Sequence, residues 1–162
     1  MSFYDDIVIG EPIELGEHLF TAEEIVRFAR AFDPQPFHLD AEAAKASLFG
    51  GLCASGWHTT AVFMKLNVRS MAAIAARRAA EGLDRPAWGP SPGVRNIKWL
   101  RPIFAGDRIA YRTTATAKRL SKSRPGWALV DSHVDAATED GKPVLSFDAS
   151  VFLRVLPDQA IS

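Results

Sequence analysis

The stretch AFDPQPFHLD, residues 31–40, holds two side chains that could do acid–base chemistry. Asp33 and His38 stand five positions apart, with two prolines between them. A carboxylate and an imidazole held together can move protons near neutral pH, especially where apolar neighbours such as Phe32 and Phe37 exclude water. The alternative is a helix C-terminus followed by a turn, in which Asp33 accepts hydrogen bonds from backbone N–H groups. The residues alone leave both interpretations open.

A second candidate group is the backbone at the start of a long helical segment. Ser55 is suited to cap this helix and Gly56 to begin it. The first N–H groups of a helix have no partner within it and lie at the positive end of its dipole. The N–H of Gly56 could therefore polarise a carbonyl and stabilise an oxyanion. An ordinary Ser-Gly helix start without a functional role explains the same residues.

The remaining reactive side chains do not form a recognised metal or phosphate site. No two histidines have metal-ligand spacing on one helical face, and there is no glycine-rich phosphate loop. We therefore expect no metal and no nucleoside triphosphate chemistry. Cys53 and His58 are expected to pack in the core, whereas His18 and His133 fall in strand-like segments and are expected at the surface. The basic segment 118–126 suits a solvated turn or a contact with a phosphate-bearing ligand.

Several helices must position these groups. Thr21 and Glu24 have the spacing of a capping box, and an apolar stripe at helical spacing follows them. Pro34 ends this helix, because a residue before proline is pushed out of the α region, so the chain leaves the helix at Asp33. Asp40 can cap a short helix that runs to about residue 46. The long helix is predicted over 56–80, and its first half is apolar nearly all round, which indicates burial on most sides.

After this helix the hydrophobic period changes to two, which is typical of strands with one wet face. Strands are predicted over 93–100, 108–118, 130–136 and 147–154, with a further one over 11–19, and Asp140-Gly141 has the pattern of a hairpin turn between the last two. Four sequential strands can form an antiparallel meander. The predicted fold class is therefore α+β, with one sheet covering a long helix.

The bulk composition excludes several classes of protein. The chain has 162 residues, enough for one domain with a sizeable core. Its 19 basic and 19 acidic residues give formal neutrality, so no overall field points to nucleic acid or a membrane surface as a partner, and weak repulsion between copies favours an oligomer. A single cysteine, and acidic residues where a signal peptide would be basic, indicate a cytoplasmic protein. Charged residues interrupt the most apolar region, so no membrane span is expected.

Taken together, these segments resemble the MaoC-like dehydratase family, which includes the (R)-specific enoyl-CoA hydratases. The family motif is an aspartate, any residue, Asn-Pro, any residue and histidine, and the run DPQPFH, residues 33–38, keeps the acid, the second proline and the histidine. The segments FGGLCASGWHTTAVFMKL and RPIFAGDRI also resemble family segments, the second with Pro102, Gly106 and Asp107 aligned. This sequence departs from the motif at Gln35 and Phe32, and these departures bear on the range of substrates.

The resemblance implies a single hotdog domain over 1–162, in which a curved antiparallel sheet wraps a long central helix. It also implies a homodimer or higher homo-oligomer that pairs sheet edges and places active sites at the interface. The partner molecule would be an acyl-CoA thioester, with no nucleic acid and no membrane.

The activity implied by the resemblance is reversible addition of water to a trans-2-enoyl-CoA. Asp33 and His38 would hold the water and transfer protons, the N–H of Gly56 would bind the thioester oxygen, and Ser55 would orient the dyad or the thioester. No metal or cofactor is needed, because the thioester itself acidifies Cα and coenzyme A is part of the substrate. Two alternatives stay open: a hotdog acyl-CoA thioesterase, and a non-catalytic acyl-CoA-binding subunit. A third keeps the reaction but takes a branched or dicarboxylic acyl group.

Overall fold

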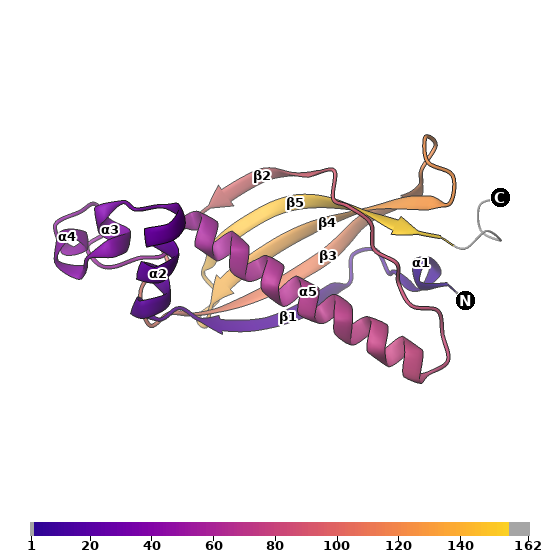
Figure 1. Ribbon diagram of the computed structural model, residues 1–162, viewed down its shortest axis with the longest axis horizontal. Helices are drawn as coiled ribbons and strands as arrows, with labels where there is room; N and C mark the ends of the chain where they lie inside the picture. The colour runs from indigo at the N-terminus through magenta and orange to yellow at the C-terminus, as the bar shows by residue number, and fades with distance from the viewer. Residues whose placement is uncertain (1, 156–162) are drawn as a thin grey trace.

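A computed structural model describes residues 2–155 of the chain, and its main feature is a curved antiparallel sheet laid along one long helix (Figure 1). The predicted α+β hotdog arrangement is confirmed. The two ends of the predicted domain, residues 1 and 156–162, lie outside the described residues. In chain order the elements are α1 (Phe3–Asp6), β1 (Pro12–Leu19), α2 (Ala22–Phe32), α3 (Pro36–Leu39), α4 (Ala41–Lys45), α5 (Gly56–Ala80), β2 (Gly93–Trp99), β3 (Arg108–Leu120), β4 (Trp127–Thr138) and β5 (Pro143–Arg154).

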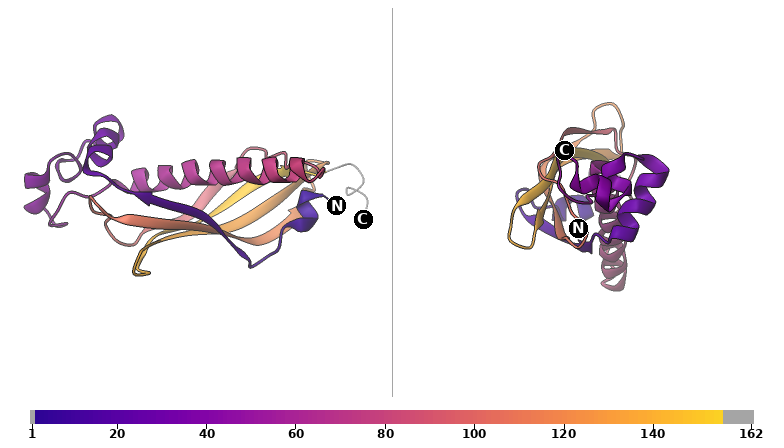
Figure 2. Two further views of the ribbon diagram at one scale, coloured as in Figure 1. Left: turned by 90° about the horizontal axis from the view of Figure 1, so that it is seen from below. Right: turned by 90° about the vertical axis from the view of Figure 1, so that its left-hand side faces the viewer.

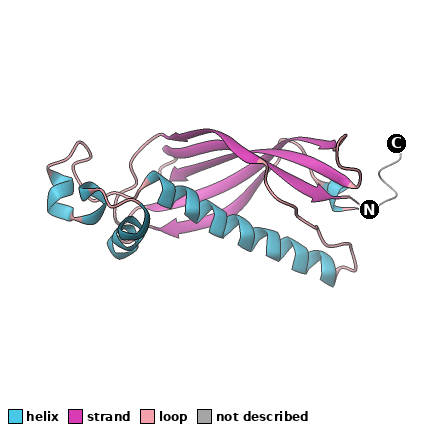
Figure 3. Ribbon diagram, turned by 45° about the horizontal axis from the view of Figure 1, so that its top comes forward, coloured by secondary structure: helices cyan, strands magenta, loops and turns pink. Residues whose placement is uncertain are grey.

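The strand order is β1-β3-β4-β5-β2, with every neighbouring pair antiparallel. The expected meander of four sequential strands is therefore wrong for β2, which pairs with β5 and not with β3. The reason is that β1 occupies the free edge of β3, which leaves β2 to cross to the opposite edge. The meander holds for β3, β4 and β5, and Gly141 has the positive φ of 79° that the predicted hairpin turn requires. Figure 3 shows the strands curving together beside the helix.

The long helix α5 spans the predicted residues and is capped as expected, with the Ser55 hydroxyl accepting a hydrogen bond from the N–H of Trp57 at 3.3 Å. Its inner side, which includes Val62 and Phe63, is buried against the sheet. The expectation of burial on most sides is wrong for the single chain, because no other element within residues 2–155 covers the outer side of α5 (Figure 2). Met64 is 53% exposed and Val68 is 55% exposed, although both also line an apolar cavity between α5 and the sheet.

The short helices α2, α3 and α4 gather beyond the N-terminal end of α5 (Figure 1). As predicted, Thr21 caps α2 by accepting from the N–H of Glu24 at 3.2 Å, and α2 ends at Phe32 before Asp33. Asp40 likewise caps α4 by accepting from the N–H of Ala43 at 2.7 Å.

Sequence reasoning missed the one-turn helix α3, which begins at Pro36 and carries His38. Proline is well suited to a first helical position, because its φ is already helical and its missing N–H would have had no partner. The two prolines therefore end one helix and begin the next. No helix within residues 2–155 combines the length and hydrophobicity needed to cross a membrane.

Candidate active site

The structure brings Asp33 and His38 together at the end of the molecule where α5 begins. Asp33 is the C-cap of α2, His38 lies in α3, and the imidazole Nε2 is 3.4 Å from a carboxylate oxygen of Asp33. The His38 side chain is 7% exposed and that of Asp33 is 19% exposed. The ring of Phe37 packs edge-on against the imidazole at 4.6 Å. Phe32, also expected to shield the pair, is instead 74% exposed, so the apolar cover on His38 comes from Phe37.

The orientation of His38 is fixed by a backbone carbonyl. Its Nδ1 lies 2.7 Å from the carbonyl oxygen of Cys53. Because a carbonyl can only accept, Nδ1 is the nitrogen that carries hydrogen, and in the neutral ring Nε2 is left with a lone pair. That lone pair and the Asp33 carboxylate oxygen are then two acceptors 3.4 Å apart. A water molecule within reach of both can donate one hydrogen to each.

The carbonyl of Cys53 is itself held in place by a second segment of chain. The N–H of Ala54 donates to the carbonyl of Ile103 at 2.8 Å, and the N–H of Ala105 donates to the carbonyl of Leu52 at 3.1 Å. These bonds join the residues before α5 to the segment RPIFAGDRI, which gives that sequence motif a structural role. It fixes the acceptor that orients His38.

The Asp33 carboxylate is stabilised by hydrogen bonds. The side-chain amide of Gln35 donates to its Oδ1 at 2.8 Å, and the Ser55 side chain also bonds to it. Burial alone would raise the pKa of Asp33, but the bonds from Ser55 and Gln35, together with nearby His38, hold the pKa below its usual value. Asp33 is therefore ionised near neutral pH. Gln35, a departure from the family motif, supplies one of the two donors.

Gly56 begins α5 directly beneath the indole of Trp99. A Cβ on residue 56 would lie 2.5 Å from a ring atom of Trp99, so only glycine allows this contact. The indole N–H of Trp99 donates to the Thr60 hydroxyl at 3.2 Å, which holds the ring over the first turn. Within residues 2–155 we find no acceptor for the N–H of Gly56. This group, on the helix that Ser55 links to Asp33, is available to a ligand oxygen.

An apolar cavity of about 620 Å³ lies between α5 and the sheet. It is lined along the helix from Trp57 and Thr60 to Ile74, and on the sheet side by residues such as Val134 and Phe147. The dyad does not line it, but Trp57 follows Gly56 directly. The cavity thus begins in the first turn of α5, next to the residue with the free N–H, and extends along the helix away from Asp33 and His38.

The other histidines and the cysteine have structural surroundings. Cys53 is 1% exposed, and burial raises the pKa of its thiol to about 11, as expected for a core residue. His58 packs as predicted, stacked on Phe28 at 4.7 Å. His18 was expected at the surface, but its side chain is 14% exposed, because its ring packs edge-on against Phe20 at 4.8 Å and its Nε2 faces a Glu24 oxygen at 3.2 Å.

His133 is half-exposed as predicted, and its Nδ1 lies 2.8 Å from a carboxylate oxygen of Asp148. In the basic segment 118–126, Lys118 bonds to backbone carbonyls and Arg119 pairs with Asp131, so these two cations are already engaged. Residues 2–155 contain no group of three or more His, Cys, Asp or Glu side chains that could hold a metal ion.

Sequence reasoning did not identify Gln35, Trp99 or the Cys53 carbonyl as parts of the site. The sequence could have indicated Gln35, because a side-chain amide two residues after Asp33 in a bend can reach its carboxylate. It could not have indicated the other two, because their roles depend on contacts between segments far apart in the chain.

Comparison with known proteins shows which family the chain belongs to. Residues 6–136 match the family model described as MaoC like domain. The chain is 39% identical over 105 residues to the uncharacterized protein YdeM of Bacillus subtilis (strain 168), which covers 65% of this chain and 67% of that protein.

Two solved structures are similar over nearly the whole length. One is a MaoC-like dehydratase from Rhodospirillum rubrum, with a TM-score of 0.80, 38% identity, and coverage of 94% of this chain and 97% of that chain. The other is a monoamine oxidase regulatory protein from Archaeoglobus fulgius, with a TM-score of 0.76, 26% identity and coverage of 95% of each chain.

Proposed function

Because the chain belongs to the MaoC-like dehydratase family, we propose that it adds water reversibly to a trans-2-enoyl-CoA to give a 3-hydroxyacyl-CoA. One observation carries the proposal. Asp33 and Nε2 of His38 are two acceptors 3.4 Å apart, and the Cys53 carbonyl holds the imidazole in the tautomer that leaves Nε2 free. This arrangement orients a water by both of its hydrogens.

In the hydration direction, the dyad holds the water while its oxygen forms a bond to Cβ of the enoyl group. One proton of the water passes to the dyad, and a proton is returned to Cα, so that the net change is addition of one water. Positioned acid–base groups of this kind contribute roughly 10²–10⁴-fold to the rate. The lowered pKa of Asp33 keeps the carboxylate ionised and able to accept a hydrogen bond from the water.

The N–H of Gly56 would bind the thioester oxygen, on which negative charge grows as water adds to Cβ. A donor at the positive end of the α5 dipole strengthens as that charge develops, and losing such a donor costs roughly 3–4 kcal/mol of transition-state stabilisation. Ser55 would act through Asp33, whose carboxylate it bonds. No metal or cofactor enters this scheme, since the thioester stabilises the negative charge at Cα.

We propose further that the protein works as a homodimer or higher homo-oligomer. The helix α5 exposes apolar side chains, including Trp57 at 56% and Met64 at 53%, both of which also line the cavity. The sheet also has two open edges, β1 and β2. Light scattering on the purified protein tests this, and a monomer at micromolar concentration contradicts it.

The test of the activity follows enoyl-thioester absorbance and free thiol together, with crotonyl-CoA and longer or branched enoyl-CoAs as substrates. Asp33→Asn and His38→Ala should each lose at least about a hundredfold in kcat/KM. The chain offers a matched control, since His133 and Asp148 form a second pair at 2.8 Å on β4 and β5. His133→Ala and Asp148→Asn should keep full activity.

The outcomes separate the rival functions. Loss of enoyl absorbance without thiol release supports hydration. Thiol release with the enoyl group intact would show a thioesterase. Binding of acyl-CoA without either signal, unchanged by Asp33→Asn, would show a non-catalytic acyl-CoA-binding subunit.

A further inference from the structure

The N-terminal segment of the chain lines the end of the apolar cavity farthest from the dyad. Phe3 and Ile7 line the cavity there, together with Trp88 from the loop after α5 and Ile74 from the helix. Figure 1 shows α1 at the opposite end of the molecule from α2, α3 and α4. The segment 2–7 thus forms an end wall for a cavity whose other end begins at the first turn of α5.

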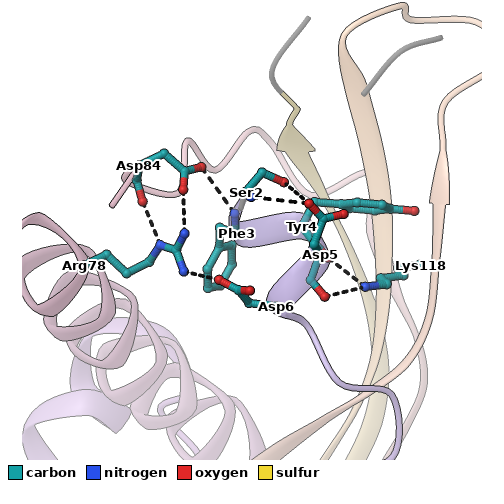
Figure 4. Close-up of polar contacts among 8 residues, drawn as sticks. All are labelled: Ser2, Phe3, Tyr4, Asp5, Asp6, Arg78, Asp84 and Lys118. Carbon is teal, nitrogen blue, oxygen red and sulfur yellow. Dashed lines mark hydrogen bonds and ion pairs between the residues drawn. The ribbon is translucent and has the colours of Figure 1, made fainter. Parts of the chain in front are cut away.

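A buried arginine holds this wall against the helix. Arg78, in the last turn of α5, is 5% exposed and bonds to the carboxylates of Asp6 and Asp84 (Figure 4). Its Nε also donates to the carbonyl of Asp84 at 2.7 Å, and the N–H of Phe3 donates to the Asp84 carboxylate at 3.2 Å. One guanidinium therefore joins α1, α5 and the following loop.

A lysine holds the same segment from the sheet. The Nζ of Lys118, on β3, donates to the carbonyls of Tyr4 at 2.7 Å and Asp5 at 3.2 Å (Figure 4). It also donates to the carbonyl of Ile7 at 2.9 Å. Two cations from different elements thus fix a segment of six residues. A wall held this way resists displacement better than one made of apolar contacts alone.

The ring of Phe3 is the part of the wall best placed to stop a chain in the cavity. It meets Trp88 edge-on at 5.3 Å, and the Arg78 guanidinium lies 5.3 Å from its centre. Tyr4, the next residue, does not line the cavity, and its ring lies 4.8 Å from the Lys118 ammonium instead.

The length of the cavity sets the scale of its ligand. From Thr60 to Ile74 the helix advances roughly 21 Å, at about 1.5 Å per residue. An extended hydrocarbon advances about 1.25 Å per carbon, from bonds of about 1.5 Å at about 111°. The cavity thus matches an unbranched chain of about seventeen carbons.

We propose that Phe3 is a specificity-determining residue that sets the longest acyl chain the protein accepts, with the segment 2–7 held as the end wall by Arg78 and Lys118. This inference rests on the proposed function, because it takes the acyl chain of the enoyl-CoA as the occupant of the cavity. Each further methylene buried should raise affinity about fourfold until the chain reaches Phe3, and no further beyond it.

The experiment compares Phe3→Ala with Tyr4→Ala, which removes a ring from the same helix without touching the cavity. Binding of saturated acyl-CoAs, lengthened in steps of two carbons, is measured by calorimetry, and turnover of the matching enoyl-CoAs is measured in parallel. Phe3→Ala should move the length at which affinity stops rising upward by at least about two carbons. Phe3→Trp should move it downward, and Tyr4→Ala should leave it unchanged.

The two measurements separate failure of this inference from failure of the proposed function. If Phe3→Ala shifts the acyl length at which affinity stops rising, but no variant turns over an enoyl-CoA, the hydratase proposal is overturned and the end wall is supported. Turnover with the same limit in all variants supports the hydratase and overturns the end wall. Equal shifts for Phe3→Ala and Tyr4→Ala, or no binding of any saturated acyl-CoA, also overturn it.

Discussion

The contact between Gly56 and Trp99 makes a prediction whose size follows from the structure. In Gly56→Ala, the new Cβ would lie 2.5, 2.6 and 2.8 Å from three atoms of the indole. Carbon atoms pack at about 3.5–4.0 Å, so the ring must move by about 1 Å. Overpacking of this kind costs about 1–3 kcal/mol, and the helical preference of alanine over glycine returns up to about 1 kcal/mol. The expected net loss of stability is about 1–2 kcal/mol.

Urea unfolding of four proteins measures this effect: the parent, Gly56→Ala, Trp99→Ala and the double variant. Without the Trp99 indole the new methyl group has room, so Gly56→Ala should become neutral or stabilising by up to about 1 kcal/mol in that background. Gly51→Ala is the matched control, because its Cβ would meet the Phe104 ring at an ordinary 3.5 Å. Equal losses from Gly56→Ala in both backgrounds would refute the reasoning, since the clash would then play no part.

Other consequences can be tested separately. Gln35→Ala removes a donor that lowers the pKa of Asp33, so the acid limb of the kcat/KM profile should move to higher pH; an unchanged limb contradicts a role for this bond. Burial lowers the pKa of His58 to about 4, while the unfolded chain titrates near 6.5, so the unfolded state binds more protons between these values. Stability should therefore fall by roughly 1–3 kcal/mol as pH drops from about 6.5 to about 4, and His58→Phe should remove that part of the slope in unfolding titrations. The Cys53 thiol, with its pKa raised to about 11, should resist iodoacetamide at pH near 8 until the protein is unfolded, as mass spectrometry can show.

The helices α2, α4 and α5 could be predicted closely because their ends depend on local chemistry. Thr21, Asp40 and Ser55 each cap the helix that follows, and each cap depends only on the next two or three residues. The pairing of β2 with β5 could not be predicted in the same way, because it does not depend on neighbouring residues in the sequence. Alternating polarity identifies a strand and its buried face but does not specify the neighbour, so strand order depends on which edge other strands leave open.

The side chains of the candidate site could be predicted from the sequence, but the groups that orient them could not. Asp33, His38, Ser55 and Gly56 could be named from chemistry, spacing and resemblance, and the structure places the first three in one bonded or paired group. The carbonyl of Cys53 could not be named, because every residue has a carbonyl and only the folded chain shows which one faces an imidazole.

The break in the chain after Asp33 is what makes the dyad possible. In a continuous α-helix each residue turns by about 100°, so side chains five positions apart point about 140° away from each other. Asp33 and His38 could not meet on one such helix. Pro34 ends α2 at the aspartate and Pro36 starts α3 two residues before the histidine, which turns the chain so that the two side chains face each other at 3.4 Å. The two prolines therefore cause the geometry of this stretch. Gln35 and the carbonyl of Cys53 then stabilise side chains that the backbone has already brought together.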